Sequence, residues 1–139
     1  MLRIWPGTLT FVHLRGDASM EKTVPAVARV NLMFRAFSDR TRLRILSRLQ
    51  HGECCVGDLV RILGIEQPSA SRHLAYLRRS GLVAVRRTGQ WCYYSLAPAQ
   101  APFHAKLLEC LACCFQDVPQ IEKDRRRAEH LWQKGGCCP

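Results

Sequence analysis

A mainly α-helical domain with a single β-hairpin is the fold class that this 139-residue sequence predicts. Apolar residues, mostly leucine, recur at helical spacing across residues 40–79. The period then changes to two short runs rich in Val, Trp and Tyr on either side of Thr88-Gly89-Gln90, which indicates a hairpin. Helical spacing returns from Phe103 to Phe115, so helices are expected on both sides of the hairpin.

The central helix is predicted over Gln67 to Arg78, because Pro68 suits a first helical turn and Gly81 follows the end. One side of this helix is apolar, and the other carries short hydrogen-bonding groups and cations near its start. Such a surface can enter the major groove of DNA and contact base edges and phosphates. The candidate DNA contacts are Gln67, Ser69, Ser71, Arg72 and His73. An ordinary amphipathic surface helix is the alternative.

Three helices are expected before the central one. Residues 22–36 carry a moderate helix signal, and Ser38 or Asp39 caps a second helix that ends at His51-Gly52. The run "CCVGDLVRILGI" predicts a third helix, which Gly64 stops. Two helices joined by a short glycine-containing turn, the second polar outside, form a helix-turn-helix.

The hairpin after the central helix adds a wing, so the predicted fold is a winged helix-turn-helix. Arg86 and Arg87 are expected to lie along phosphates or in the minor groove, unless the hairpin is only a solvated surface. Another apolar surface must pack against the stripe formed by Phe103, Leu107, Leu111 and Phe115. The first helix and a second copy of the chain would supply it, which predicts a homodimer through the terminal helices on a near-palindromic site.

Composition narrows the partner and the compartment. Lys and Arg number 21 against 11 Asp and Glu, a net charge of +10 that favours a polyanionic partner. No apolar run reaches the about 18 residues needed to cross a bilayer, and Pro6, Gly7, His13 and Arg15 interrupt any signal-peptide core. We therefore expect no membrane association and a cytoplasmic location.

The chain divides into three expected parts. Residues 1–21 are expected to be a disordered N-terminal extension, with Met20 as an alternative start. Residues 22–116 form the winged helix-turn-helix DNA-binding and dimerisation domain, and residues 117–139 form a charged C-terminal tail with a cysteine pair.

Eight cysteines without an export signal favour thiol chemistry, a metal site or a redox switch over a disulfide scaffold. The spacing i, i+3, i+4 allows Cys110, Cys113 and Cys114 to share one helix face. They are either ligands for a soft ion or small apolar residues that continue the Leu107–Leu111 stripe. Cys54 and Cys55 are the second candidate site, at a helix start whose dipole favours thiolates, or else a cap region with one buried thiol.

The other cysteines have subsidiary expected roles. Cys55 could also join Cys113 or Cys114 in one site, within or between chains. Cys92 is expected to be structural, while Cys137 and Cys138 are either an auxiliary ligand pair or a loose reactive tail.

The run from "FSDRTRLRIL" through "SASRHLAYLRRSGLV" to "RRTGQWCYYSL" resembles the ArsR/SmtB family of winged-helix, metal-sensing repressors over roughly residues 24–116. The resemblance implies a homodimer that occupies an operator until an inducer lowers its affinity for DNA. The arsenic-sensing branch has Cys-Val-Cys-Asp-Leu before the recognition helix, and here the run is Cys55-Val56-Gly57-Asp58-Leu59. The first thiol is kept, Gly57 replaces the second, and Cys54 is extra. The Asp-x-His of the family's zinc site is absent, and His104 is the only histidine in Phe103–Phe115.

The function predicted from these features is a repressor that leaves its operator when As(III), as arsenite or a methylated arsenical, or Sb(III) binds cysteine thiolates. Zinc is the other ion that the thiols could take. A thiol redox or persulfide sensor of the same fold is the alternative. An enzyme is disfavoured, because no cysteine occupies a strand-to-helix elbow and the chain has little room for a substrate cleft.

Overall fold

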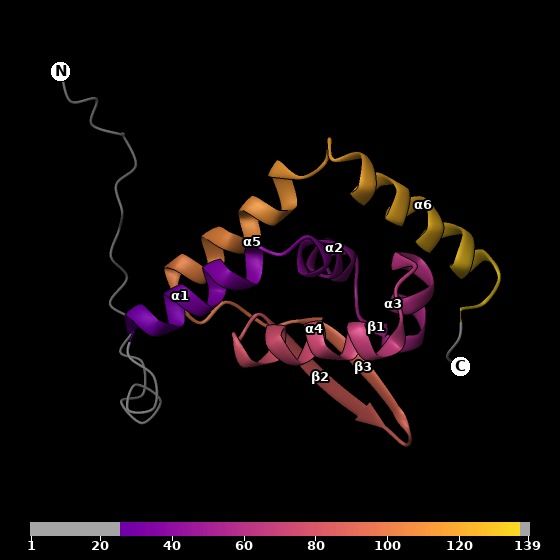
Figure 1. Cartoon of the computed structure of the whole chain (residues 1–139), viewed down its shortest axis with the longest axis horizontal. Coiled ribbons are helices and arrows are strands. Elements are labelled where there is room, and N and C mark those ends of the chain that lie inside the picture. The colour runs from indigo at the N-terminus through magenta and orange to yellow at the C-terminus, as the bar shows by residue number, and fades with distance from the viewer. Residues whose placement is uncertain (1–25, 137–139) are drawn as a thin grey trace.

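The computed structural model describes residues 26–136, which form a helical domain with a small sheet (Figure 1). The elements in chain order are α1 (Ala26–Phe37), α2 (Arg40–Leu49), β1 (Cys54–Cys55), α3 (Val56–Leu63), α4 (Gln67–Arg79), β2 (Val83–Thr88), β3 (Trp91–Leu96), α5 (Pro102–Cys114) and α6 (Pro119–Gln133). The predicted fold class, mainly α with a β-hairpin wing, is confirmed.

The helix ends have local causes in the sequence. Asp39 caps α2 by accepting a hydrogen bond of 2.9 Å from the backbone N–H of Arg42. Gly64 ends α3 in the left-handed conformation at φ 64°, which costs glycine little. Pro68 lies in the first turn of α4, where its missing N–H leaves no hydrogen bond unmade. The second helix ends at Leu49, before the predicted end at His51-Gly52. These two residues lie in the turn that follows the helix.

The sheet is antiparallel with the strand order β1-β3-β2. The β2–β3 hairpin pairs Val83 with Leu96 at one end and Thr88 with Trp91 at the other, around the predicted glycine turn. β1 corrects the expectation that the third helix starts at Cys54. Cys54 and Cys55 instead pair with Tyr94 and Tyr93, because the open edge of β3 supplies backbone partners that a helix start would lack.

One hydrophobic core joins the helix-turn-helix to the wing and to α5. Its members come from all six helices, from β1, and from Leu82 and Val83 at the start of the hairpin. The largest fully buried apolar side chains are Ile45, Leu46, Leu59, Ile62, Leu74, Leu77, Leu82 and Leu111. Leu74 and Leu77 belong to the predicted apolar side of α4, so burial of this side turns the opposite side of the helix outward.

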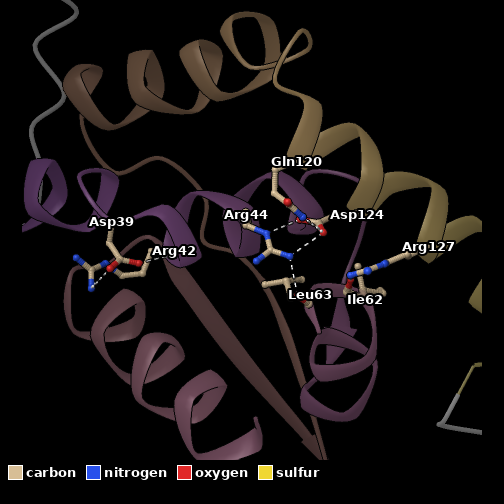
Figure 2. Close-up of polar contacts among 8 residues, drawn as sticks. All are labelled: Asp39, Arg42, Arg44, Ile62, Leu63, Gln120, Asp124 and Arg127. Carbon is tan, nitrogen blue, oxygen red and sulfur yellow. Dashed lines mark hydrogen bonds and ion pairs between the residues drawn. The ribbon is translucent and has the colours of Figure 1, made fainter. Parts of the chain in front are cut away.

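The last helix, α6, is docked on the domain: it packs against α2 and α3, with Ala128 and Asp124 buried. Figure 2 shows Arg44 of α2 reaching Asp124 of α6, while Arg127 of α6 reaches the carbonyl of Ile62 in α3. Residues 117–139 were expected to be a charged tail, and the packing of their helical part was not anticipated.

At the opposite side of the domain α5 lies along α1 (Figure 1). The rings of Phe34 and Phe103 are 5.1 Å apart between centroids, so the first helix meets the α5 stripe as expected. Phe34 and Val27 nevertheless stay 55 % and 79 % exposed. None of the described helices is long and apolar enough to cross a bilayer.

Candidate nucleic-acid interface and thiol sites

The outer side of α4 is polar and open to solvent. Gln67, Ser71 and Arg72 are exposed, as the sequence predicts for groups that contact DNA. Ser69 is half-buried and therefore less available than its neighbours. Arg78, which the sequence analysis did not include, is exposed about two turns further along the same helix. Its spacing of seven residues from Ser71 could have signalled that it shares the outer side.

His73 and Arg42 lie at a junction between α1, α2 and α4. The Nδ1 atom of His73 is 3.6 Å from a carboxylate oxygen of Asp39, and the ring is half-buried. Arg42 donates to the carbonyl oxygens of Ala36 (3.0 Å) and Arg35 (2.8 Å), and its guanidinium stacks on the Tyr76 ring. These contacts orient α4 relative to α2. They give Arg42 a structural role.

The wing arginines differ from each other. Arg86 forms a two-point contact with Glu53, with nitrogen–oxygen distances of 2.6 and 3.3 Å, and also donates to the hydroxyl of Thr88. Its guanidinium lies over the Tyr93 ring. The hydrogen bond from Arg86 lowers the pKa of Glu53, so this carboxylate stays charged and competes with phosphate for the arginine. Arg87 is exposed, so it can contact a phosphate without first leaving a carboxylate partner.

Cys54 and Cys55 are both only 3 % exposed. Successive residues of a strand point to opposite faces. Accordingly, Cys54 belongs to the hydrophobic core, while the Cys55 sulfur caps α3 by accepting a hydrogen bond of 3.4 Å from the N–H of Asp58. Both buried thiols are therefore near the start of α3, as predicted.

Arg48 is a buried cation beside this region, and the sequence analysis missed it. It is 5 % exposed, interacts with Cys54 and Asp58, and stacks on Trp132 at 4.1 Å. Burial lowers the pKa of Arg48, while the charges of Cys54 and Asp58 and a hydrogen bond to Cys54 act in the opposite direction. Its spacing from Ile45 and Leu49 places it on the apolar side of α2, a signal that could have revealed it.

The last turn of α5 brings two thiols together. The sulfurs of Cys113 and Cys114 are 3.5 Å apart and both residues are exposed, so Cys114 does not continue the buried stripe. Cys113 also donates to the carbonyl of Glu109, and its hydrogen bond with Cys114 raises its pKa, which keeps the thiol protonated at neutral pH. Cys110 is half-buried one turn earlier. In the described part of the chain no three His, Cys, Asp or Glu side chains form a ready-made metal site.

The remaining candidate thiols fall in two places. Cys92 is half-buried in β3 opposite Arg87. Cys137 and Cys138 lie outside the described residues, so their predicted roles are not addressed by the structure. None of the six described cysteines forms a disulfide with another.

A solvent-exposed polar helix that follows a short helix and precedes a basic hairpin defines a winged helix-turn-helix DNA-binding protein. Residues 39–85 match the family described as "Bacterial regulatory protein, arsR family". The "Arsenical resistance operon repressor" of Escherichia coli (strain K12) is 42% identical over 89 residues, which cover 63% of this chain and 76% of the relative. The chain belongs to the ArsR family of bacterial regulatory proteins.

Further relatives agree with this assignment. "Arsenic resistance transcriptional regulator ArsR1" of Pseudomonas putida is 46% identical over 68 residues, 48% of this chain and 53% of its own length. Reduced HlyU from Vibrio cholerae N16961 superposes with a TM-score of 0.57 at 32% identity, covering 71% of this chain and 98% of its own. The transcriptional repressor BigR from Xylella fastidiosa superposes with a TM-score of 0.52 at 35% identity, and the match covers 70% of this chain and 93% of BigR.

Proposed function

We propose that this protein is a homodimeric repressor that binds operator DNA and leaves it when a trivalent arsenical or antimonite binds the thiols at the end of α5. The operator lies in the cytoplasm, where we expect the protein to act. The observation that carries the inducer assignment is the pair Cys113–Cys114, exposed and with sulfurs 3.5 Å apart. Relatives named for arsenical resistance support the same class of inducer.

The distance between these sulfurs suits a shared soft ion. Two sulfurs each roughly 2.3 Å from one ion, as in zinc thiolates, are about 3.3 to 3.8 Å apart for bond angles between a right angle and the tetrahedral value. Cys113 and Cys114 fall in this interval without rearrangement. Cys110, one helical turn earlier, is the third ligand that we propose, since rotation of its side chain would bring it toward the pair.

The ligand exchange balances without an external oxidant. Arsenous acid, As(OH)₃, reacts with three thiols to form three As–S bonds, and its three hydroxides leave as water with the three thiol protons. Protonated thiols are thus competent reactants, which suits the raised pKa of Cys113. Cys54 and Cys55 are the weaker candidates here, because both are buried and their side chains point apart.

The DNA-binding part of the proposal rests on α4 and the wing. Gln67, Ser71 and Arg72 form the exposed start of α4, and we propose that they contact base edges and phosphates in the major groove. Arg87, and Arg86 after release from Glu53, would meet phosphates beside it. Ser69 and His73 would act at the edge of this surface.

The homodimer would form through α1 and α5. Val27 and Phe34 leave large apolar side chains in solvent on α1, next to the α5 stripe, and a second copy would bury them. A two-fold dimer also presents two copies of α4 to successive major grooves.

The test is fluorescence anisotropy of the fully reduced protein on labelled DNA from upstream of its own gene, titrated with arsenite. We expect the wild type to bind and then to be released at about one or two ions per dimer. The variant with Cys113→Ser and Cys114→Ser should bind the DNA equally well but stay bound. Cys92→Ser is the matched control and should respond like the wild type.

Other outcomes would redirect the proposal. Retained release in the Cys113→Ser, Cys114→Ser variant would move the site to Cys54 and Cys55. Release by mild oxidant, with no effect of arsenite, would replace the arsenical inducer by the redox-sensing alternative.

A further inference from the structure

A cavity of about 580 Å³ lies between α2, α5 and α6, at the side of the domain remote from the wing. Its apolar wall includes Leu111 of α5, Phe115 at the C-terminal cap of α5, and Ile121 and Trp132 of α6. This volume lies within the range of roughly 300–1,000 Å³ that is typical of small-molecule sites. The cavity exists because α6 folds back on α2, and none of the five cysteines assigned to inducer binding lines it.

Ser47 and Arg48 of α2 line this cavity and carry three buried donor atoms that lack a hydrogen-bond partner among the described residues. Ser47 and Arg48 are each 5 % exposed, and the Ser47 hydroxyl and the Nε and Nη1 atoms of Arg48 form no hydrogen bond with any described residue. Buried donors are almost always paired in folded proteins, and an unpaired one is costly. Three donor atoms on neighbouring residues therefore point to an acceptor that occupies the cavity, and the positive charge of Arg48 favours an anionic one.

The other charges around the cavity are already matched. Asp124 is paired with Arg44 at 2.7 Å, and Arg125 contacts both Glu122 and Glu129. Among the charged side chains that line the cavity, Arg48 is thus the one without an ion pair to another lining residue. An anion beside it would be attracted by a buried cation that Asp58 balances only in part.

We propose that this cavity binds a small monoanion with an apolar, ring-sized body, its anionic group held by Arg48 and Ser47. The ring would lie between Phe115 and Trp132, and the charged group would meet the inner wall at α2. An aromatic monocarboxylate has this chemistry. The site is distinct from the thiols at the end of α5, and it stands whether or not those thiols sense arsenic.

Arg48 also connects the cavity to the helix-turn-helix. Its guanidinium interacts with Cys54, the first residue of β1, and with Asp58 in the first turn of α3. α3 is the helix that packs against α4. An anion on Arg48 competes for the same guanidinium, so occupancy of the cavity would act on the position of α3, the first helix of the DNA-binding pair.

The experiment uses the reduced full-length protein and two matched probes, 2-naphthoate and the neutral 2-naphthalenemethanol, in isothermal titration calorimetry. We expect one naphthoate per chain with a Kd below about 1 mM, since a ligand of this size binds at least that tightly when most of it is buried. The alcohol should bind at least about tenfold more weakly, because it lacks the charge-assisted hydrogen bonds. Equal affinity for the two probes, or no saturable binding of naphthoate, would overturn the proposal.

Variants locate the anionic subsite. Arg48→Gln should lose the preference for the acid over the alcohol, whereas Lys123→Gln, which removes an exposed α6 cation outside the cavity, should keep it. Ser47→Ala retains the charge and should weaken naphthoate binding severalfold, which keeps the test open if Arg48→Gln does not fold. A folded Arg48→Gln protein that still prefers the acid would place the anion elsewhere and refute the site.

Discussion

Arg44 and Asp124, eighty residues apart in the chain, form a bidentate ion pair that fastens α6 to α2 (Figure 2). The two nitrogen–oxygen distances are 2.7 and 2.8 Å, and Arg44 also donates to the carbonyl of Leu63 at the end of α3. Asp124 accepts a further hydrogen bond from Gln120. One arginine thereby joins three helices, and the docking of α6 creates the cavity that Arg48 and Ser47 line.

Asp124→Asn should therefore destabilise the protein by about 3 kcal/mol, because it leaves a largely buried guanidinium without its counter-charge. Urea denaturation monitored by circular dichroism gives the change in the free energy of unfolding. Glu129→Gln, in an exposed ion pair of the same helix, is the control and should unfold close to the wild type. Equal stabilities of the two variants would show that the Arg44–Asp124 pair does not hold α6.

Arg72→Ala should weaken operator binding by roughly 10- to 100-fold, the usual effect of removing an arginine that contacts a base or phosphate. Arg72 is exposed near the start of α4, so its removal should leave the fold intact. Anisotropy titrations at one fixed salt concentration measure the effect. Arg126→Ala on α6 removes the same charge far from α4 and should change the affinity much less; similar losses in both would indicate non-specific electrostatics only.

Glu53→Gln should tighten operator binding severalfold. The substitution frees Arg86 from its carboxylate partner and removes a negative charge close to the wing. The dependence of log K on log salt should steepen by roughly one unit if Arg86 gains a phosphate contact. Glu109→Gln, which breaks an exposed pair with Lys106 on α5, is the matched control. Unchanged affinity and slope in Glu53→Gln would mean that Arg86 stays off the DNA.

His104 should make the stability fall on the acid side of neutrality. Burial lowers its pKa, and Nδ1 accepts a 3.4 Å hydrogen bond from the N–H of Gln100. The folded protein therefore holds His104 neutral. Below the ordinary histidine pKa of about 6.5, the unfolded chain binds a proton at His104 that the folded chain does not bind. The stability is therefore retained above that pH and decreases below it, by at most about 1.4 kcal/mol per pH unit.

His104→Gln should remove this contribution. Denaturation at pH 7.5 and pH 5.5 should show a smaller loss of stability on acidification in His104→Gln than in the wild type. The exposed His130, substituted as His130→Gln, serves as the control and should keep the wild-type dependence. If His104→Gln loses as much stability as the wild type, other groups cause the acid sensitivity.

Phe34→Asp should dissociate the proposed dimer, because it places a charge in the apolar surface that α1 and α5 share. Sedimentation velocity should show monomers at concentrations at which the wild type is dimeric. Phe34 is 55 % exposed, so the fold should survive the substitution. Asn31→Asp adds the same charge at another exposed position of α1 and should remain dimeric. A Phe34→Asp protein that stays dimeric would place the interface elsewhere.

The elements of this protein follow from local patterns that the sequence displays. Leucine spacing predicts α2 and α4, Ser38 or Asp39 predicts the start of α2, and the Thr88-Gly89-Gln90 turn between β-rich runs predicts the wing. Each depends on interactions within a few residues, which is why periodicity and turn chemistry suffice. The exposed side of α4 follows in turn, because burial of Leu74 and Leu77 leaves Ser71 and Arg72 outward.

Tertiary packing decided what these patterns could not. The pairing of Cys54 and Cys55 with β3 turned an expected helix start into a strand and directed the two thiols to opposite faces. The seating of α6 on α2 depends on Arg44 and Asp124, whose separation of eighty residues no local pattern encodes. By itself, then, the sequence determined the winged helix-turn-helix and its exposed basic surface. Only long-range contacts decided which thiols meet and where a cavity opens, because both depend on segments that approach one another only after folding.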